Sequence, residues 1–341
     1  MPKSQRPVTM RDVAKLAGVS QSTVSRILSQ PASTSIPISD ETYKRVYSAI
    51  EELGYQLNLA ARSLRTQRTN MIAVMIADIS NAFYHSITRT IQDIAAQRNY
   101  DVLIANTDHV YEYEKRFIQA MMRRPVDGVI LVPYHLTFDE IDSFVERTGV
   151  AVAALARHLD HPLVDTVSAD DGTATYEAVN WLIAQKGHRR IGFIGVSTAF
   201  MVGERRHQGY MRALAEAGLD APPEYLERGD FTAESGARAM AALMALPEPP
   251  TAVFACNDIM AVGALNTALD LGLRVPQDVA LVGFDNIPLA EQVRPRLTSV
   301  AQYPVDMGRE LANLLFARID GTTTQHQRLD IPCRLIERES A

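Results

Sequence analysis

From about residue 70 onward, short apolar runs alternate with longer stretches in which apolar residues recur every three or four positions. The runs have the length of buried strands, and the stretches have the period of amphipathic helices. This alternation predicts parallel sheets covered by helices. The predicted strands are Ile72–Ile76, Val102–Ile104, Gly128–Val132, Ala151–Leu155, Ile191–Ile194, Ala252–Ala255 and Ala280–Val282, and the clearest helices are Ile87–Arg98, Thr173–Gln185, Gly209–Ala217 and Ile259–Leu271. Two doubly wound lobes of this kind form a cleft at the carboxyl ends of their strands, where a small ligand binds in such an architecture.

The N-terminal segment has the pattern of short helices instead. Thr9 followed by Asp12 is a capping pattern, so a helix begins near Met10. Its predicted apolar face consists of Val13, Leu16 and Ala17. Gly18 can end this helix in the left-handed conformation, and Ser20 can cap a second helix over residues 21–28.

The two helices have the spacing of a helix-turn-helix. Ala14 is small enough for close helix approach, Gly18 makes the turn, and Val24 packs between the helices. An ordinary helical hairpin is the alternative interpretation. A third helix begins after Ser39 and ends at Gly54. Its predicted apolar side consists of Tyr43, Val46, Tyr47, Ile50 and Leu53.

Residues 55–66 contain good helix formers in a stretch too short to be stable alone, which indicates a linker that folds conditionally. The sequence therefore divides into an all-α helix-turn-helix head (1–56), a hinge helix or linker (57–69) and a two-lobed α/β domain (70–341). Within that domain we expect an N-lobe of about residues 70–170 plus 302–325, and a C-lobe of about 171–301 plus 326–341.

Charge is distributed unevenly along the 341 residues. The net charge is −6, but residues 1–70 hold ten Lys and Arg against five Asp and Glu, a net charge of +5 that leaves −11 for the rest. A basic head on an acidic body is the arrangement expected of a phosphate-binding module attached to a sensor domain.

Several classes of protein are disfavoured. No stretch approaches the roughly 20 apolar residues of a membrane span, and residues 1–11 contain no apolar run of a signal peptide. Cys256 and Cys333 form neither a C-x-x-C motif nor a disulfide framework, so we expect two reduced thiols in a cytoplasmic protein.

No catalytic motif is present. The chain lacks the G-x-S-x-G, H-E-x-x-H, P-loop and G-x-G-x-x-G patterns. His158 and His161 could ligate a metal only with a third ligand, which is not apparent nearby, and Asp170 and Asp171 are adjacent, which favours a loop or cap role over a catalytic pair. We therefore expect no enzyme activity, no metal site and no cofactor.

Segments spread along the whole chain resemble the lactose/galactose repressor (LacI/GalR) family. They are Thr9–Ser20, Thr23–Arg26, Glu51–Tyr55, Ala61–Arg65, Gly187–Ile191, Cys256–Asp258 and Val282–Asp285, in family order. The resemblance implies a sequence-specific DNA-binding transcriptional regulator, and a repressor in particular. It also implies that residues 70–341 form an effector-binding and dimerisation domain that resembles a periplasmic sugar-binding protein.

The resemblance and the helix-turn-helix geometry together indicate the DNA contacts. Gln21, Ser22 and Arg26 are expected to face base edges, whereas Thr9, Thr23 and Ser25 lie nearer phosphates. The family hinge implies further contacts from Asn58, Ala61 and Leu64, with Leu64 wedged into the minor groove. The implied partner is a near-palindromic operator bound by a homodimer, and no heptad tail near Ser340 suggests a tetramer.

The same resemblance implies an effector pocket. Its polar contacts are Arg206, Asn257 and Asp285, a set suited to ring hydroxyls. Its remaining members are Phe83, Tyr84, Phe231 and Gln302, with Gln302 in a strand that connects the lobes. An alternative role for Phe83 and Phe231 is packing in the hydrophobic core. We expect a sugar as the effector. A purine or nucleoside co-repressor is the main alternative, and a small-molecule-binding protein or enzyme without DNA function is a third.

Two features depart from the family pattern. Ala156 stands where many members have an aspartate, so one hydroxyl acceptor is missing and the ligand should differ from theirs. The loop from Ser29 to Ser39 is several residues longer than usual, which leaves its DNA contacts open.

Overall fold

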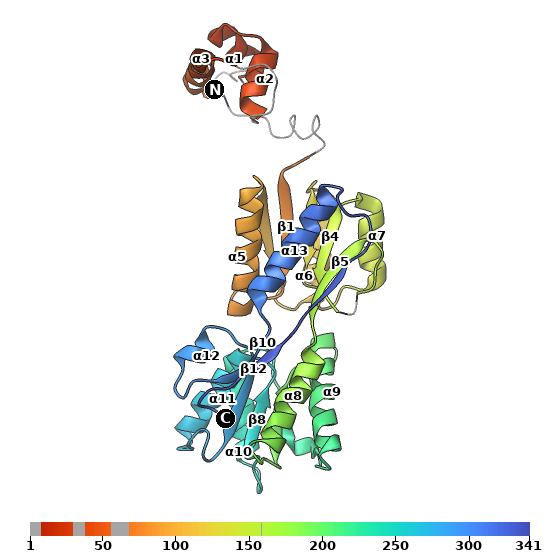
Figure 1. The fold of residues 1–341 in the computed structure, drawn as a ribbon, viewed down its shortest axis with the longest axis vertical. Helices are drawn as coiled ribbons and strands as arrows, with labels where there is room; N and C mark the ends of the chain where they lie inside the picture. The colour runs from red at the N-terminus through yellow and green to blue at the C-terminus, as the bar shows by residue number, and fades with distance from the viewer. Residues whose placement is uncertain (1–7, 30–37, 56–67, 158) are drawn as a thin grey trace, which may run out of the picture. The chain divides into compact units, whose positions relative to one another are not determined.

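The computed structural model describes residues 8–29, 38–55, 68–157 and 159–341. The chain divides into two compact units, Met1–Thr69 and Asn70–Ala341 (Figure 1). The predicted hinge contacts Asn58, Ala61 and Leu64 lie outside the described residues, as do His158 and residues 30–37 of the longer loop.

The described part of the first unit contains three helices around a small core. They are α1 (Met10–Ala17), α2 (Gln21–Ser29) and α3 (Asp40–Leu53). Gly18 and Gly54 end α1 and α3 with φ of 64° and 59°, as their left-handed caps require. The core consists of Val13, Ala14, Ala17, Val24, Ile27, Val46 and Ala49.

Three residues predicted on the apolar faces of these helices are exposed instead. The exposed fractions are 45% for Leu16, 39% for Tyr43 and 49% for Tyr47. In α3 the buried positions are Val46 and Ala49, three residues apart, so the stripe that packs against the head core excludes both tyrosines. The predicted apolar face of α3 was wrong at Tyr43 and Tyr47, because these large aromatic residues were taken as buried in place of the small Ala49.

The second unit begins with a lobe built on a six-stranded sheet (the N-lobe). Its strands are β1 (Met71–Ile76), β2 (Asp101–Asn106), β3 (Gly128–Leu131), β4 (Ala151–Leu155), β5 (Val164–Ala169) and β11 (Arg328–Ile331). Every pair is parallel, in the order β11-β5-β4-β3-β1-β2. One face is covered by α5 (Ala82–Gln97) and α13 (Pro304–Ile319), which lie side by side (Figure 1), and the other by α6 (Tyr111–Met121) and α7 (Phe138–Thr148).

The other lobe of this unit (the C-lobe) has a second six-stranded sheet. Its strands are β6 (Ile191–Gly195), β7 (Leu226–Arg228), β8 (Ala252–Ala255), β9 (Ala280–Asp285), β10 (Thr298–Ala301) and β12 (Arg334–Ile336), in the order β12-β10-β9-β8-β6-β7. Its helices are α8 (Asp171–Ala184), α9 (Met201–Glu216), α10 (Ala233–Met244), α11 (Asp258–Asp270), the short α12 (Leu289–Gln292) and the 3₁₀ turn η1 (Pro223–Tyr225). The edge strand β12 pairs antiparallel with β10, which departs from the all-parallel expectation.

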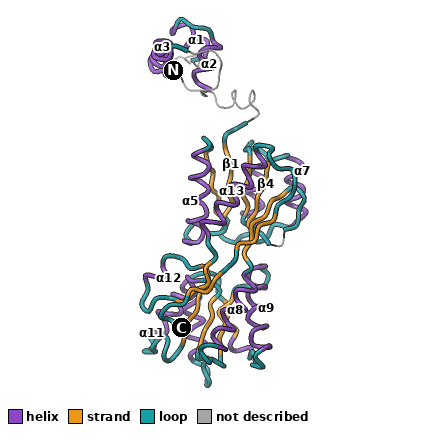
Figure 2. Tube along the Cα trace, in the orientation of Figure 1, coloured by secondary structure: helices purple, strands orange, loops and turns teal. Residues whose placement is uncertain are grey.

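The chain passes between the lobes three times, after β5, after β10 and after β11 (Figure 2). The last passage corrects the predicted boundary, which assigned residues 326–341 to the C-lobe. β11 instead joins the N-lobe sheet, where Arg328 pairs in register with Thr166, so only the residues after it belong to the C-lobe. Within the described residues, no helix is long and apolar enough to cross a membrane.

Candidate ligand-binding site

A cavity of about 110 Å³ lies in the second unit and is lined by residues of both lobes. This volume has room for several waters, and hence for a small polar ring. All seven residues predicted as effector contacts line it: Phe83, Tyr84, Arg206, Phe231, Asn257, Asp285 and Gln302. Their assembly in one cavity leaves their role as ligand contacts a prediction. Residues that the sequence interpretation missed also line it: Asn81, His109, Tyr134, Arg157, Ser168, Asp171 and Arg205.

Arg206 is the most enclosed cation of the cavity, with an exposed fraction of 4%. Its Nη1 donates to the carbonyl of Cys256, and its guanidinium lies 3.8 Å from the ring centroid of Phe284. Nε has no hydrogen bond, and Asp171 Oδ2 is 3.5 Å away. Burial alone lowers the pKa of Arg206, but the carboxylates of Asp171 and Asp285 outweigh burial and raise it. A permanently charged donor with an unfilled N–H therefore lies in the cavity wall.

Asp285 supplies a carboxylate at the end of β9. One oxygen, Oδ1, accepts a hydrogen bond of 2.6 Å from Gln302 Nε2. Gln302 lies just beyond β10 rather than within a strand. Burial raises the pKa of Asp285 to about 6, against an attraction from Arg206 that lowers it. The second oxygen of Asp285 remains available as an acceptor for a ligand hydroxyl.

The side chain of Asn257 binds mainly to nearby backbone groups. Its side chain caps α11, because Oδ1 accepts from the backbone N–H of Met260 at 2.8 Å. Its Nδ2 donates to the carbonyl of Phe231 at 3.2 Å. Both ends of the amide are thus used within the protein, and one N–H is left for a ligand.

Aromatic rings from both lobes meet in the cavity. The rings of His109 and Phe231 stack with centroids 4.7 Å apart and an interplanar angle of 14°, and Tyr134 packs edge-on against His109 at 4.4 Å. The hydroxyls of Tyr84 and Tyr134 are 2.8 Å apart. Burial raises the pKa of Tyr134 to about 12 and lowers that of His109, so both present neutral groups at physiological pH. Nδ1 of His109 is buried without a hydrogen bond within the described structure.

Tyr134 is positioned by a buried acid that the sequence interpretation overlooked. The carboxylate of Glu114 accepts hydrogen bonds from the backbone N–H groups of residues 134, 135 and 136 at 2.9 to 3.0 Å. An acid on the apolar face of an amphipathic helix was the available signal, because a buried carboxylate requires donors.

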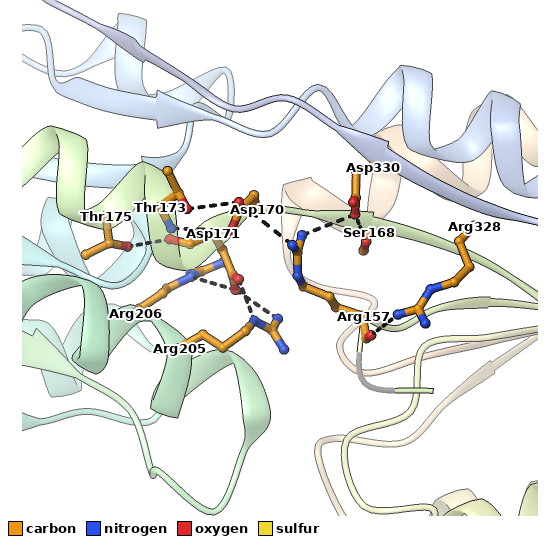
Figure 3. A network of polar contacts seen from close by, with 10 residues as sticks. All are labelled: Arg157, Ser168, Asp170, Asp171, Thr173, Thr175, Arg205, Arg206, Arg328 and Asp330. Carbon is orange, nitrogen blue, oxygen red and sulfur yellow. Dashed lines mark hydrogen bonds and ion pairs between the residues drawn. The ribbon is translucent and has the colours of Figure 1, made fainter. Parts of the chain in front are cut away.

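Asp171 and Arg205 form the second group that was missed. Asp170 has the predicted cap role, since its side chain accepts a hydrogen bond from the backbone N–H of Thr173. Asp171 is buried, and its carboxylate binds Arg205 through two hydrogen bonds (Figure 3). Arg205 Nε lies 2.6 Å from Asp171 Oδ1, and Arg205 Nη2 lies 3.0 Å from Asp171 Oδ2. One carboxylate thus serves two neighbouring arginines of α9, Arg205 and Arg206.

The predicted DNA contacts that the structure describes lie in the first unit: Thr9 before α1, Gln21, Ser22 and Thr23 in the first turn of α2, and Ser25 and Arg26 further along α2. Thr9 precedes α1, where its backbone N–H and hydroxyl both donate to Asp12 Oδ2, at 2.9 and 2.6 Å. Ser20 caps α2 through the backbone N–H of Thr23 at 3.1 Å. Gln21 and Ser22 are exposed, whereas Thr23, Ser25 and Arg26 are half-buried. These positions present the first turn of α2 to solvent, as base readout requires.

The described part of the chain contains no group of three or more His, Cys, Asp or Glu that could hold a metal ion. Both cysteines are free, Cys256 buried and Cys333 half-buried.

Comparison with protein families defines the class of protein. Residues 9–58 match the model of bacterial regulatory proteins of the lacI family, and residues 181–341 match a periplasmic binding protein-like domain. A helix-turn-helix head is therefore joined to a two-lobed ligand-binding body in one chain.

Individual relatives cover nearly the full length. The chain is 38% identical to the transcriptional repressor CytR of Escherichia coli (strain K12), over 99% of this chain and 97% of the relative. It is 35% identical to catabolite control protein A of Priestia megaterium, over 98% and 99% of the two chains. The solved Lac repressor dimer bound to operator matches with a TM-score of 0.82 at 26% identity (98% and 99% covered), and a CelR–cellobiose complex matches with 0.72 at 33% identity (98% and 100% covered). The chain belongs to the lacI family and is a DNA-binding transcriptional regulator.

Proposed function

We propose that this regulator is a homodimeric repressor whose affinity for a near-palindromic operator is set by a sugar or sugar derivative bound in the cavity between the lobes. The observation that carries the proposal is the cavity itself, in which a buried arginine, a carboxylate and aromatic rings from both lobes converge. Such a set fits several hydroxyls and the apolar face of one ring. We place the protein in the cytoplasm, where a bacterial operator lies.

Relatives support a carbohydrate ligand. The CelR structure is described as a cellobiose complex, and a Lac repressor structure is described as bound to ONPG. The second candidate is a purine or nucleoside, favoured by the parallel stack of His109 and Phe231, because flat rings of this kind also stack on a base. Ala156 lines the cavity without an acceptor, which separates this site from those that keep an acid there.

The head would read the operator through the start of α2. Gln21, Ser22 and Arg26 are the proposed base contacts, with Thr9, Thr23 and Ser25 nearer phosphates. A single head of this size buries too little surface for tight specific binding, which favours two heads on one operator. The Lac repressor relative is described as a dimer bound to operator, and sedimentation velocity tests the same state here.

A ligand screen followed by operator binding tests the proposal. Sugars, sugar phosphates, purines and nucleosides are screened by thermal shift on the full chain, and hits are assayed against an operator selected from random DNA. Asp285→Ala and Arg206→Ala should abolish the thermal shift and the change in operator affinity. Asp278→Ala, at an exposed pair with Arg274, is the control and should leave both intact. A sugar effect that survives loss of both Arg206 and Asp285, or stabilisation by purines alone, contradicts the proposed ligand or site.

A further inference from the structure

Positive charge exceeds negative charge in the wall of the cavity. Among the described residues that line it, three are arginines (Arg157, Arg205 and Arg206) and two are aspartates (Asp171 and Asp285). The whole chain has the opposite sign, with a net charge of −6. One buried carboxylate, that of Asp171, is shared by Arg205 and Arg206. Arg157 is paired with Asp330 and Asp170, neither of which lines the cavity, so the arginines that an anionic group on a ligand would meet are Arg205 and Arg206, which share one carboxylate.

Arg205 is the arginine with the geometry to meet an anion. Asp171 holds it side-on through Nε and Nη2, which fixes the plane of the guanidinium. Its Nη1 has no hydrogen bond within the described part of the chain, and its side chain keeps an exposed fraction of 23%. A guanidinium that is fixed on one edge and open on the other presents the fork that binds carboxylate and phosphate oxygens.

The other two arginines are less suited to this role. Arg206 is nearly fully buried, and its Nη1 is committed to the carbonyl of Cys256. Arg157 turns its guanidinium toward Asp330 at 3.1 Å and Asp170 at 3.8 Å (Figure 3). Arg206 keeps an N–H without a hydrogen bond at Nε, but this atom is buried and lies 3.5 Å from Asp171 Oδ2, and the guanidinium of Arg157 is held by acids outside the cavity wall.

We propose that Arg205 is a specificity-determining residue that reads an anionic group, a phosphate or a carboxylate, on the effector. This inference rests on the proposed function, since it concerns the ligand of the same cavity. The simpler alternative is that Arg205 only neutralises Asp171. The alternatives differ in outcome, because a purely structural arginine affects folding without changing which ligand is preferred.

The experiment compares neutral and anionic forms of the same ligand by isothermal titration of the full-length protein. The probe pairs are glucose and glucose 6-phosphate, ribose and ribose 5-phosphate, and adenosine and its 5′-monophosphate. Glucuronate distinguishes a carboxylate from a phosphate, and inorganic phosphate tests the anion alone. The variants are Arg205→Met and Arg205→Lys, with Arg212→Met as the control, since Arg212 lies on the same helix, is exposed and is absent from the cavity wall.

The expected result is that an anionic probe binds the wild type about tenfold or more tightly than its neutral partner, as charge-assisted hydrogen bonds imply. The ratio should fall to about one in Arg205→Met, remain unchanged in Arg212→Met and take an intermediate value in Arg205→Lys, which keeps the charge but loses the fork. Circular dichroism verifies folding, and Arg205→Lys decides the test if Arg205→Met does not fold.

Two results would overturn the inference: neutral partners that bind the wild type as tightly as the anionic probes, or an unchanged ratio in both Arg205 variants. Failure of the proposed function looks different. In that case no ligand that binds the cavity changes operator affinity, whatever its charge.

Discussion

Three cavity residues that are not glycine have backbone conformations that side chains rarely adopt. The φ angles are 56° for His109, 70° for Phe231 and 109° for Asp285. Such conformations cost free energy and persist only where surrounding contacts impose them, which is common at ligand sites. The hydrogen bonds from Asn257 to the Phe231 carbonyl and from Gln302 to Asp285 are contacts of this kind. We infer that the cavity walls are preorganised.

The raised pKa of Asp285 predicts that effector binding weakens in mild acid. Burial raises this pKa from 3.8 to about 6, so the carboxylate that attracts Arg206 and accepts a ligand hydroxyl is lost as the pH falls below about 6. Titration calorimetry between about pH 7.5 and pH 5 should show declining affinity in the wild type. Asp285→Asn should bind weakly at all these pH values, with a flatter profile.

Unfolding does not account for this loss. Because the folded-state pKa lies above the unfolded value, protonation of Asp285 stabilises the fold as the pH falls from about 6 toward 4. Asp258, whose pKa burial also raises, acts in the same direction. An affinity that stays constant down to about pH 5 would contradict a role for the Asp285 carboxylate in binding.

For single residues, the sequence predicted those that belong to family motifs and missed those whose role depends on a contact with a residue far away in the chain. Arg206 and Asp285 were found through motifs, but Arg205 acquires its role from Asp171, 34 residues away, and Tyr134 from Glu114, 20 residues away. Neither pairing has a local pattern. His109 carries no motif either, and only the meeting of the two lobes brings its ring onto Phe231.

Among the elements, the strands with continuous apolar runs were predictable, including the edge strand β2, and the short or polar strands were not. The central strands β1, β3 and β8 are almost fully buried and consist of continuous apolar residues. The edge strands β7, β11 and β12 are short and partly exposed, so no apolar run marks them. β5 is buried but polar, because Asp165 within it is paired with Arg318 at 2.8 Å across 153 residues. Hydrophobic pattern therefore identified the strands that are apolar along their length and missed those that are short or polar.

Close packing of α10 on α11 gives a stability prediction. A Cβ built on Gly263 would lie 1.8 Å from the carbonyl oxygen of Ala233, and one on Gly236 would lie 2.0 Å from that of Met260. These neighbours are backbone atoms, which cannot move aside as the end of a flexible side chain can, so Gly263→Ala must push α10 and α11 apart. We expect a loss of about 1–3 kcal/mol or more in the free energy of unfolding, measured by urea denaturation. Asn266→Ala, on the exposed face of α11, should stay within about 0.5 kcal/mol of wild type, and equal effects of the two changes would refute the packing argument.

The first turn of α2 gives a prediction about DNA. Gln21→Ala should alter which operator sequence is preferred, because its exposed amide can pair with a base edge at a discrimination of about 1–3 kcal/mol. Selection from random DNA with wild type and variant measures the change. Glu51→Ala, at an exposed position of α3, serves as the control and should keep the wild-type preference. Uniform weakening on all sequences would instead indicate a phosphate contact.

For the whole molecule, the important feature is the set of connections between the lobes. The passage after β5 carries Asp170, and the passage after β11 follows Asp330. Arg157, at the end of β4, lies 3.8 Å from Asp170 Oδ2 and 3.1 Å from Asp330 Oδ1 (Figure 3). Ser168 donates to the same oxygen of Asp330. A residue of the cavity wall is thereby linked to two of the three passages, and a ligand that shifts Arg157 would alter both.

Reciprocity of binding gives the last prediction. If the effector changes operator affinity by some factor, the operator must change effector affinity by the same factor, since both report one coupling free energy. Asp330 lies in β11 just before the third passage and does not itself line the cavity, although it pairs with Arg157 of the wall. Asp330→Asn removes its charge, so it should change that factor about threefold or more, with a smaller change in effector affinity in the absence of DNA. Effector titrations with and without operator measure it. Asp93→Asn breaks an exposed pair with Arg89 on α5 and should leave the factor unchanged. A factor equally unchanged in Asp330→Asn would show that the lobes respond to the ligand by a route that does not pass through Arg157.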